Sequence, residues 1–391
     1  MQNNLKSQFL LNPDITYLNF GSFGSCPKPI FEEYQRFQLE LEMEPVQFIA
    51  VNGLEYLKTS REALARYINC NADDVVYTMN PSYAINIIAK SFKLNAGDEI
   101  LTTNLEYGAM DRTWNYYCKK AGAKYVQQPI TLPLVSKEKF IEEFFKGLTN
   151  KTKAIFISQI TSTTALIFPV KEICEIAKSK GLFTIVDGAH VPGHIPLNLA
   201  EMQADVYTGA CHKWMCAPKG CAFLYVKKEY QNMLDPLVIS WGYQAEHPSN
   251  SQFLDYHQTQ GTRDFSAFLT IPKTIQFLTE NNWTAVAAEC RKLAQANYSR
   301  FCKLLGSTPL SPISDEFIGQ MCSIPMQCTA PEKLQRLLFE KYKIEIPVME
   351  KDGSVLIRYS IQAYNSQEDL DKLYNALSEI ISQTDLIQVK N

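Results

Sequence analysis

Short apolar runs alternate with segments of helical periodicity through the first two thirds of the chain. The runs are DDVVYT, DEILTT, KAIFIS, FTIVD, DVYTG and AFLYV. Helical patterns separate them near Tyr83–Phe92, near Ala109–Ala121 and in KEICEIAKSK, which Gly181 closes. Runs that are apolar on both faces and are separated by helices are typical of βαβ units with a mainly parallel, covered sheet. The pattern therefore predicts an α/β fold.

The pattern changes after about Thr270. Long helical segments cover 272–280 and 284–305, and a mixed tail follows: a helix in PEKLQRLLFEKYK, a strand in SVLIRYS and a helix in SQEDLDKLYNALSEIIS. Ser366 and Asp369 make a capping box for the last helix. Since 391 residues exceed a usual single domain, we expect an N-terminal segment (1–25) packed with the small domain, a large α/β domain (26–275) and a small α+β domain (276–391).

Two charged residues follow successive predicted strands. Asp187 ends FTIVD, and Lys213 comes just after DVYTG. In a parallel sheet, ligands bind beyond the carboxyl ends of the strands. A carboxylate there is costly unless it meets a cation, and a desolvated lysine becomes a neutral amine that attacks aldehydes. An Asp-Gly turn and a lysine reaching out to solvent are the plain alternatives, but the combination favours a site.

Composition narrows the possible partners. The chain is 46% hydrophobic and 20% charged, as in ordinary soluble globular proteins. A net charge of -3 provides no basic field for nucleic acid or an anionic membrane, which favours a small-molecule partner. No signal-peptide pattern and no apolar stretch of about 18 residues is present, so a cytoplasmic protein is expected.

The cysteines suggest thiols rather than a metal centre. Eleven cysteines, an odd number, do not make a short disulfide framework, and most are expected to be small core residues. Cys211, Cys216 and Cys221 with His212 invite a zinc interpretation. Their spacing does not fit a zinc knuckle, and Cys221 falls in a predicted core strand, so no metal site is predicted.

Six segments, in this order, resemble the class V branch of fold-type I pyridoxal 5'-phosphate (PLP) enzymes, and within it the isopenicillin N epimerase group. They are NPSYAIN, LEYGAM, VDGAHVPG, GACHKW, QGTRD and IRYSIQAYN. The resemblance extends from about Tyr17 to Leu373. It implies a PLP-dependent transferase fold, PLP as the cofactor and a homodimer.

The resemblance assigns the central roles. Lys213 would hold PLP as a Schiff base and, once released, would shuttle the α-proton. Asp187 would keep the pyridine nitrogen protonated. His190 would lie near the phenolic oxygen, and Tyr107 would lie on the ring face opposite Lys213. As isolated residues, His190 could equally be a packed loop residue and Tyr107 one more core aromatic.

The phosphate of PLP has candidate donors at a helix start. Pro81, Ser82 and Tyr83 open a helix after a strand, where free N–H groups and the helix dipole suit an anion. The resemblance adds Thr208 and His212 as side-chain donors.

The resemblance also marks departures from the desulfurases of the same class. Ala210 stands where they have a serine, which redistributes the phosphate contacts. Ser162 stands where they have an asparagine, and Ser162 or Thr164 would donate to the phenolic oxygen. Thr262 of QGTRD would reach the phosphate from the other subunit, so the active site would need two chains.

Substrate binding is expected from two segments. Arg358 lies in the apolar strand SVLIRYS and resembles the arginine that binds the substrate carboxylate, a role that suits a planar, permanently charged fork. A surface ion pair is the alternative. Asn19 and Phe20 would form another side of the substrate site.

The expected reaction is epimerisation or racemisation at an amino-acid Cα. Carbon–sulfur lysis of cysteine or cystine and transamination remain alternatives. Desulfurase chemistry is disfavoured, because KYKIEIPVMEKDG has no cysteine where those enzymes need a mobile thiol. A non-catalytic binding protein on the same fold is a remote alternative, since Lys213, Asp187 and Arg358 are all present.

Overall fold

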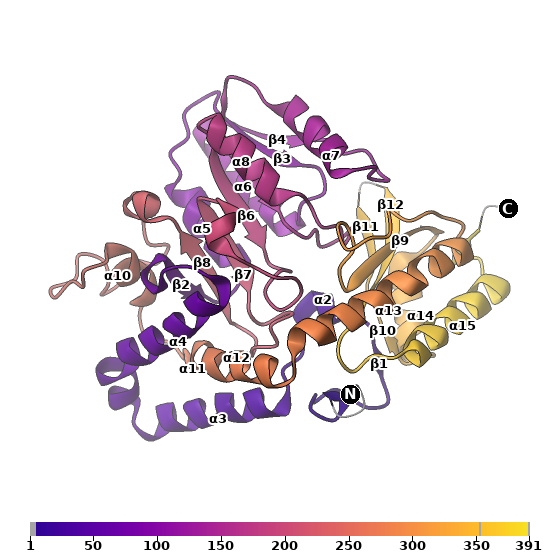
Figure 1. Cartoon of the computed structure of the whole chain (residues 1–391), viewed down its shortest axis with the longest axis horizontal. Coiled ribbons are helices and arrows are strands. Elements are labelled where there is room, and N and C mark those ends of the chain that lie inside the picture. The colour runs from indigo at the N-terminus through magenta and orange to yellow at the C-terminus, as the bar shows by residue number, and fades with distance from the viewer. Residues whose placement is uncertain (1–4, 352, 390–391) are drawn as a thin grey trace.

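A seven-stranded sheet forms the centre of the larger part of the molecule in the computed structural model, which describes residues 5–351 and 353–389 (Figure 1). The strand order is β2-β8-β7-β6-β5-β3-β4. The strands are β2 (Val75–Thr78), β3 (Glu99–Thr103), β4 (Lys124–Gln128), β5 (Thr152–Ser158), β6 (Phe183–Gly188), β7 (Val206–Ala210) and β8 (Ala222–Val226). All neighbours are parallel except β8, which is antiparallel to β7 and to β2. A loop without a crossover helix joins β7 to β8, as an antiparallel pair allows, and it carries Lys213.

Alternate side chains of each strand enter two separate apolar cores. In β5, Ile155 and Ile157 join one core, and Ala154 and Phe156 join the other. This period of two places one core on each face of the sheet. Covering helices on the two faces explain why the strands read as continuous apolar runs. The α/β fold predicted from the sequence is confirmed.

Helices surround this sheet (Figure 1). They are α2 (Phe20–Phe23), α3 (Lys28–Met43), α4 (Gly53–Ile68), α5 (Pro81–Ser91), α6 (Gly108–Ala121), α7 (Lys137–Phe144), α8 (Val170–Ser179), α9 (Leu199–Met202), α10 (Gln252–Gln258), α11 (Ser266–Leu269) and α12 (Ile271–Glu280). Short π or 3₁₀ helices cover Gln47–Val51, Ala72–Asp74, Phe145–Gly147 and Lys228–Met233.

A second, antiparallel sheet lies in the C-terminal part. Its order is β11-β12-β9-β13, and its strands are β9 (Met321–Cys328), β11 (Val348–Lys351), β12 (Ser354–Ser360) and β13 (Ile387–Gln388). The long helix α13 (Trp283–Leu304) packs on β9 and on α15 (Gln367–Gln383), and α14 (Pro331–Glu340) packs on β11. The predicted capping box of Ser366 and Asp369 is present at the start of α15.

The N-terminal segment connects the two sheets. Strand β1 (Thr16–Tyr17) pairs in parallel with β10 (Ile344–Glu345) of the C-terminal part. The segment then passes through α2 to Gly24, where a Cβ would lie 2.3 Å from the carbonyl oxygen of His212. Gly24 also has φ +67°, a left-handed backbone conformation that glycine adopts without strain. Both this conformation and the close approach to His212 require a residue without a side chain. The N-terminal segment therefore packs directly on the backbone that carries Lys213.

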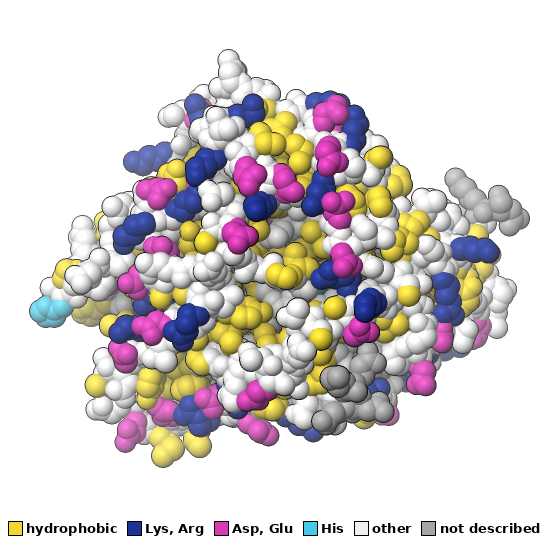
Figure 2. Space-filling model, viewed as in Figure 1, with side chains coloured by type: hydrophobic (Ala, Val, Ile, Leu, Met, Phe, Trp, Pro, Cys, Tyr) yellow, Lys and Arg dark blue, Asp and Glu magenta, His cyan; other side chains and the backbone are white. Residues whose placement is uncertain are grey.

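Three further features concern membrane-spanning helices, cysteines and surface charge. No helix of the described residues is both long and apolar enough to cross a membrane. The eleven cysteines are free thiols, nine of them buried, as the sequence predicts for core residues. On the face seen in Figure 2, basic and acidic side chains are interspersed.

Candidate active site

A cavity of about 480 Å³ opens where the loops after β2, β3, β5, β6 and β7 meet the N-terminal segment. Eight residues predicted from the sequence line it: Pro81, Ser82, Tyr107, Ser162, Asp187, His190, His212 and Lys213. The carboxyl ends of parallel strands meet at one edge, which is why residues far apart in sequence come together here.

Lys213 lines this cavity. Its Nζ is 3.3 Å from Nε2 of His190. The pKa of Lys213 is lowered to about 8: burial lowers it most, Asp187 opposes that effect, and Arg358 adds to it. Near neutral pH a usable fraction of this side chain is the neutral amine, which is the nucleophilic form.

Asp187 stands beside Lys213 at the end of β6. It is buried, and its carboxylate accepts the backbone N–H of Ala189 at 2.9 Å. Burial raises the pKa of Asp187, while the Ala189 N–H and Lys213 oppose that rise. In the sheet register, Asp187 lies opposite Ser158 of β5 on one side and opposite Thr208 of β7 on the other. This register fixes the position of Asp187 along the strand direction.

His190 connects Lys213 to the core. It is buried, and its Nδ1 lies 3.2 Å from the indole nitrogen of Trp214. Burial and the adjacent Lys213 hold the pKa of His190 well below the usual value, so the imidazole is neutral.

The start of α5 offers one free backbone donor. Asn80 caps this helix and accepts the N–H of Tyr83 at 2.8 Å, and Pro81 has no N–H. Ser82 lines the cavity, and no cap or turn hydrogen bond from its N–H is found among the described residues. The hydroxyl of Tyr83 donates to Gln260 at 3.0 Å. In this turn the N–H of Ser82 is therefore the one available to an anion, while the amide of Tyr83 is already used.

Three predicted side-chain donors are committed elsewhere. The hydroxyl of Thr208 donates to Phe223 O at 2.7 Å inside the sheet, and Thr164 is bonded to Thr161 at 2.7 Å. His212 places Nδ1 2.7 Å from Cys221 O, so Nδ1 carries the proton. Burial lowers the pKa of His212 to about 4. Its Nε2 is then an acceptor, and it donates to an anion only after protonation.

The N-terminal segment presents different residues from the two predicted. Phe20 is fully buried against Trp214, with ring centroids 5.2 Å apart, and Asn19 donates to Glu345 at 3.3 Å. Ser22 and Phe23 of the same helical turn line the cavity instead. The N-terminal segment does line the cavity, but the turn of α2 directs Phe20 inward and leaves Phe23 68% exposed.

Thr262 lies outside this cavity. It is exposed, in the segment after α10. Its neighbour Gln260 reaches Tyr83 at the start of α5, so the QGTRD segment passes near the helix start within one chain.

Arg358, on β12, lies behind the residues that line the cavity. It is buried, and its guanidinium donates to the carbonyl and hydroxyl of Ser162 and, at 3.2 Å, to the hydroxyl of Ser22. Its Nε has no hydrogen-bond partner among the described residues, and no carboxylate there lies within ion-pair distance of it. Burial lowers the pKa of Arg358 to about 10. A buried cation held only by neutral groups is suited to an incoming anion.

The sequence did not single out several residues of the site. Ser158, Lys219, Met79 and Phe23 line the cavity. Glu106 lies beneath it, fully buried, and accepts from the backbone and hydroxyl of Ser158. Burial raises the pKa of Glu106 to about 7. In the sequence, the only indication that Glu106 belongs to the site is its position directly before Tyr107 and shortly after an apolar strand.

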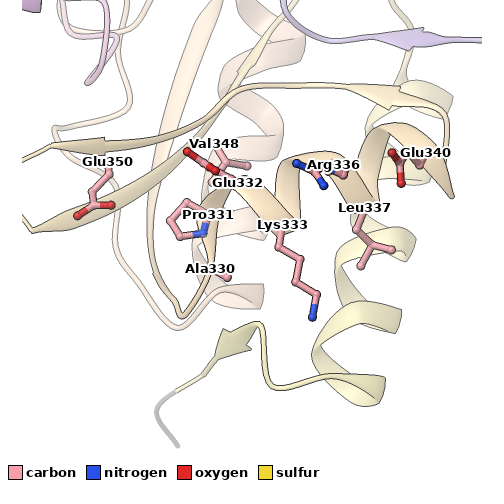
Figure 3. Close-up of a pocket in the computed structure, with 9 residues that line it drawn as sticks. All are labelled: Ala330, Pro331, Glu332, Lys333, Arg336, Leu337, Glu340, Val348 and Glu350. Carbon is pink, nitrogen blue, oxygen red and sulfur yellow. The ribbon is translucent and has the colours of Figure 1, made fainter.

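A larger hollow of about 860 Å³ lies elsewhere, between α14 and the edge strand β11 (Figure 3). Its charged side chains are of both signs, including Glu332, Lys333 and Arg336. It contains neither Lys213 nor any group that contacts it, so size does not identify the site here. Within the described residues, no group of three or more His, Cys, Asp or Glu side chains is placed to hold a metal ion.

Comparison with known proteins decides the family. The family model described as aminotransferase class-V matches residues 29–373. The chain belongs to the class V aminotransferase family. It is 31% identical to isopenicillin N epimerase of Streptomyces clavuligerus over 97% of this chain and 98% of that protein. It is 27% identical to a putative L-cysteine desulfhydrase of Oryza sativa subsp. japonica, over 94% of this chain and 83% of that protein.

Solved structures agree on the fold. The cysteine desulfurase of Thermococcus onnurineus NA1 superimposes with a TM-score of 0.83 at 19% identity, over 97% of this chain and 98% of that chain. Another neighbour, C-DES with glycine covalently linked to its PLP cofactor, has a TM-score of 0.82 at 19% identity, over 96% and 99% of the two chains. The class V chain described here is thus a fold-type I enzyme, and PLP is its cofactor.

The cavity fits that cofactor by its donor set. It offers an amine at Lys213, a buried carboxylate at Asp187, an unpartnered helix-start N–H at Ser82 and an aromatic ring at Tyr107. These are the groups that an aldehyde, a pyridine nitrogen, a phosphate and a ring face require.

Proposed function

We propose that this class V enzyme is an epimerase or racemase acting at the Cα of an amino-acid substrate. The observation that carries the proposal is Arg358, a fully buried guanidinium whose hydrogen-bond partners among the described residues are the neutral groups of Ser162 and Ser22. It lies behind Ser22 and Ser162, which line the same cavity as Lys213. A substrate α-carboxylate would satisfy this cation and bring Cα toward the amine.

Each residue has a separate task in this proposal. Lys213 would hold the cofactor through Nζ, and afterwards its amine, with a pKa of about 8, would take a proton from Cα and return one. Asp187 would hold a proton at the pyridine nitrogen, Tyr107 would cover the ring, and Ser82 would bind the phosphate, joined by His212 once its Nε2 is protonated. When bound, PLP supplies an electron sink for the charge left at Cα when one of its bonds breaks.

Epimerisation is preferred for two reasons. Isopenicillin N epimerases match this chain at 30% and 31% identity over nearly its full length, ahead of the desulfhydrases at 27% or less. No cysteine is among the residues that line the cavity, which disfavours persulfide chemistry. The bulky rim of Phe23, Met79 and Tyr107 fits a substrate with an apolar portion.

Carbon–sulfur lysis is the second candidate. Several relatives are named L-cysteine desulfhydrase, and one is named hercynylcysteine sulfoxide lyase. The same Lys213 amine that removes an α-proton would serve a β-elimination, which needs no enzyme thiol. Transamination is a third outcome of the same proton abstraction.

A screen of the holoenzyme separates these reactions. L-amino acids and cystine are incubated in deuterated buffer, and α-proton exchange, pyruvate and keto acid are scored separately. Exchange with loss of optical rotation, without pyruvate, supports the epimerase; prompt pyruvate from cystine overturns it in favour of the lyase.

The cofactor linkage is tested at the same time. Lys213→Ala should abolish the yellow, borohydride-reducible adduct, and the exposed Lys228→Ala should retain it. An intact wild-type chain that cannot be reconstituted with PLP would overturn the whole proposal.

We also propose a cytoplasmic homodimer in which Thr262 completes the partner's phosphate site. The support is the exposed position of Thr262 and the proximity of its segment to α5. Sedimentation of the holoenzyme measures the assembly, and a Thr262→Ala chain should bind PLP more weakly. A monomer with full PLP affinity would contradict the dimer.

A further inference from the structure

Trp214 follows Lys213 directly but points away from the cavity. It is fully buried, and its ring stacks on His194 with centroids 4.1 Å apart. Phe20 contacts it from another side. The only polar atom of this large side chain, Nε1, lies 3.2 Å from Nδ1 of His190.

This contact determines where His190 carries its proton. An indole N–H can only donate, so Nδ1 of His190 must present a lone pair. The imidazole is neutral, because burial and the nearby Lys213 hold its pKa well below the usual value. The remaining proton is therefore on Nε2, the atom that lies 3.3 Å from Nζ of Lys213.

We propose that Trp214 is a positioning residue, whose indole N–H selects the tautomer of His190 so that an N–H, and not a lone pair, faces the Lys213 nitrogen. An N–H donor at this place is satisfied by a neutral amine and opposes an ammonium. Trp214 thus keeps the reactive nitrogen in its nucleophilic form. The inference concerns the cofactor-free chain and rests on the proposed function only for its catalytic meaning.

The indole is itself held in place by a second histidine. His194 receives the backbone N–H of Gln320 on Nε2 at 2.6 Å and donates from Nδ1 to His190 O at 2.9 Å. A backbone N–H and a carbonyl allow only that tautomer. A Cβ on Gly319 would lie 2.2 Å from Nε2 of His194, so the backbone approaches closely there. The loop before β9 therefore supports the ring on which Trp214 stacks.

The other titratable and charged groups around His190 do not select its tautomer. The titratable and charged groups that act on it are Lys213, Arg358, His194 and His212. Arg358, and Lys213 whenever it is protonated, oppose a second proton on the imidazole. His194 offers it no acceptor, since both ring nitrogens of His194 are already used. The choice between the two neutral tautomers is left to the indole.

The test is the pH dependence of Lys213 acetylation in the cofactor-free full chain. Acetic anhydride labels the neutral amine, and peptide mass spectrometry reports Lys213 against exposed lysines of the same sample. In Trp214→Phe, which keeps a flat ring and removes the N–H, the midpoint should move upward by roughly half to one pH unit, as expected for the loss of one neutral hydrogen bond. The pH at which the absorbance of the bound cofactor changes should move in the same direction in the holoenzyme.

Trp283→Phe is the matched control. Trp283 is also a buried tryptophan, and its indole donates to the carbonyl of Gly193 at 3.1 Å without contacting His190. This variant should leave the Lys213 midpoint unchanged. In a His190→Ala background, Trp214→Phe should have no further effect on the midpoint, because the two residues act through one contact.

An unchanged midpoint in Trp214→Phe, or an equal change in Trp283→Phe, would overturn the proposal. If Trp214→Phe does not fold, the wild-type chain still decides, since it has only five histidines. Nitrogen-15 spectra of histidine-labelled protein, with His190 assigned by substitution, should show Nε2 protonated and Nδ1 bare; the opposite tautomer would disprove it. These readouts are independent of substrate, so they stand even if the reaction proves to be lysis.

Discussion

The guanidinium of Arg358, on the C-terminal sheet, donates to both the backbone carbonyl and the hydroxyl of Ser162, which follows β5 of the large sheet. One buried cation thereby joins the two sheets at the edge of the active-site cavity. The same guanidinium reaches Ser22 of the N-terminal segment. A single side chain therefore joins the two sheets and the N-terminal segment, and it is also the side chain proposed to bind the substrate carboxylate.

Arg358→Gln should lower kcat/KM by roughly 10²-fold, because it removes charge-assisted, bidentate binding of a carboxylate. Most of the loss should appear in KM. Bound-cofactor absorbance should remain, since Arg358 is not among the residues that line the cofactor cavity. Arg336→Gln, on the exposed α14, is the control and should behave as wild type. Equal losses in the two variants would remove Arg358 from substrate binding.

Gly24→Ala should disrupt the packing of the N-terminal segment on the Lys213 loop. The added Cβ would lie 2.3 Å from His212 O and 2.9 Å from Lys213 Cα, at φ +67°. We expect a loss of about 2–4 kcal/mol in unfolding free energy, from overpacking and left-handed strain together, and weaker PLP binding. Gly24 O also accepts from Lys219 at 3.1 Å, so the shift should reach the cavity.

Gly97→Ala separates the effect of left-handed backbone strain from the effect of overpacking. Gly97 has φ +87°, but a Cβ there would have no neighbour within 4 Å. This control should lose only about 1 kcal/mol, the cost of left-handed backbone, with PLP binding intact. Thermal denaturation and PLP titration of both variants provide the measurements. If Gly24→Ala binds PLP as tightly as Gly97→Ala does, the packing argument is wrong.

The sequence predicted the elements that follow from periodicity. The continuous apolar runs and their order along the chain placed Asp187 and Lys213 after two successive strands. In the structure these strands, β6 and β7, are adjacent and parallel. The same reasoning located Arg358 within a strand. These predictions depend only on local pattern and on the rule that loops converge at the carboxyl edge.

Other features depend on side-chain direction, which a pattern does not contain. Phe20 and Phe23 are both apolar residues of one short helix, yet only the three-dimensional turn decides that Phe23 faces the cavity. The hydroxyl of Thr208 could have pointed to the cavity but donates to Phe223 across an antiparallel pair. In the sequence, Trp214 is indistinguishable from an ordinary core residue. Its role is inferred only from the hydrogen bond between its indole nitrogen and Nδ1 of His190.

Glu106 provides a prediction on pH and stability. Its pKa is about 7 because burial penalises the carboxylate, despite hydrogen bonds from Ser158 and Thr103. The folded state then holds a proton that the unfolded state loses near pH 4.5, so stability falls as pH rises from about 4.5 to about 7 and stays low above it. The full effect is on the order of 3 kcal/mol.

Glu106→Gln should remove this slope. The amide oxygen can still accept from Ser158, and its NH₂ can donate to Thr103, so the variant should fold. Urea unfolding of the cofactor-free chain at pH 5 and pH 8 measures the change. Relative to wild type, the variant should gain stability on going to pH 8, whereas the exposed Glu332→Gln should not. A gain of the same size in both variants would contradict the assignment.

Lys213→Met should make the cofactor-free chain more stable below about pH 8. The folded-state pKa of Lys213, about 8, lies below its usual value of 10.5, so the fold disfavours the ammonium. The penalty is fully present below the folded-state pKa, decreases between the two values, and vanishes when both states are neutral. The melting temperature of Lys213→Met should therefore exceed that of wild type most at pH 7 and converge with it near pH 10, while Lys228→Met, on the surface, should track wild type throughout. A variant less stable than wild type at pH 7 would mean that Lys213 stabilises the fold, which would contradict a lysine that is kept for its chemistry at a cost in stability.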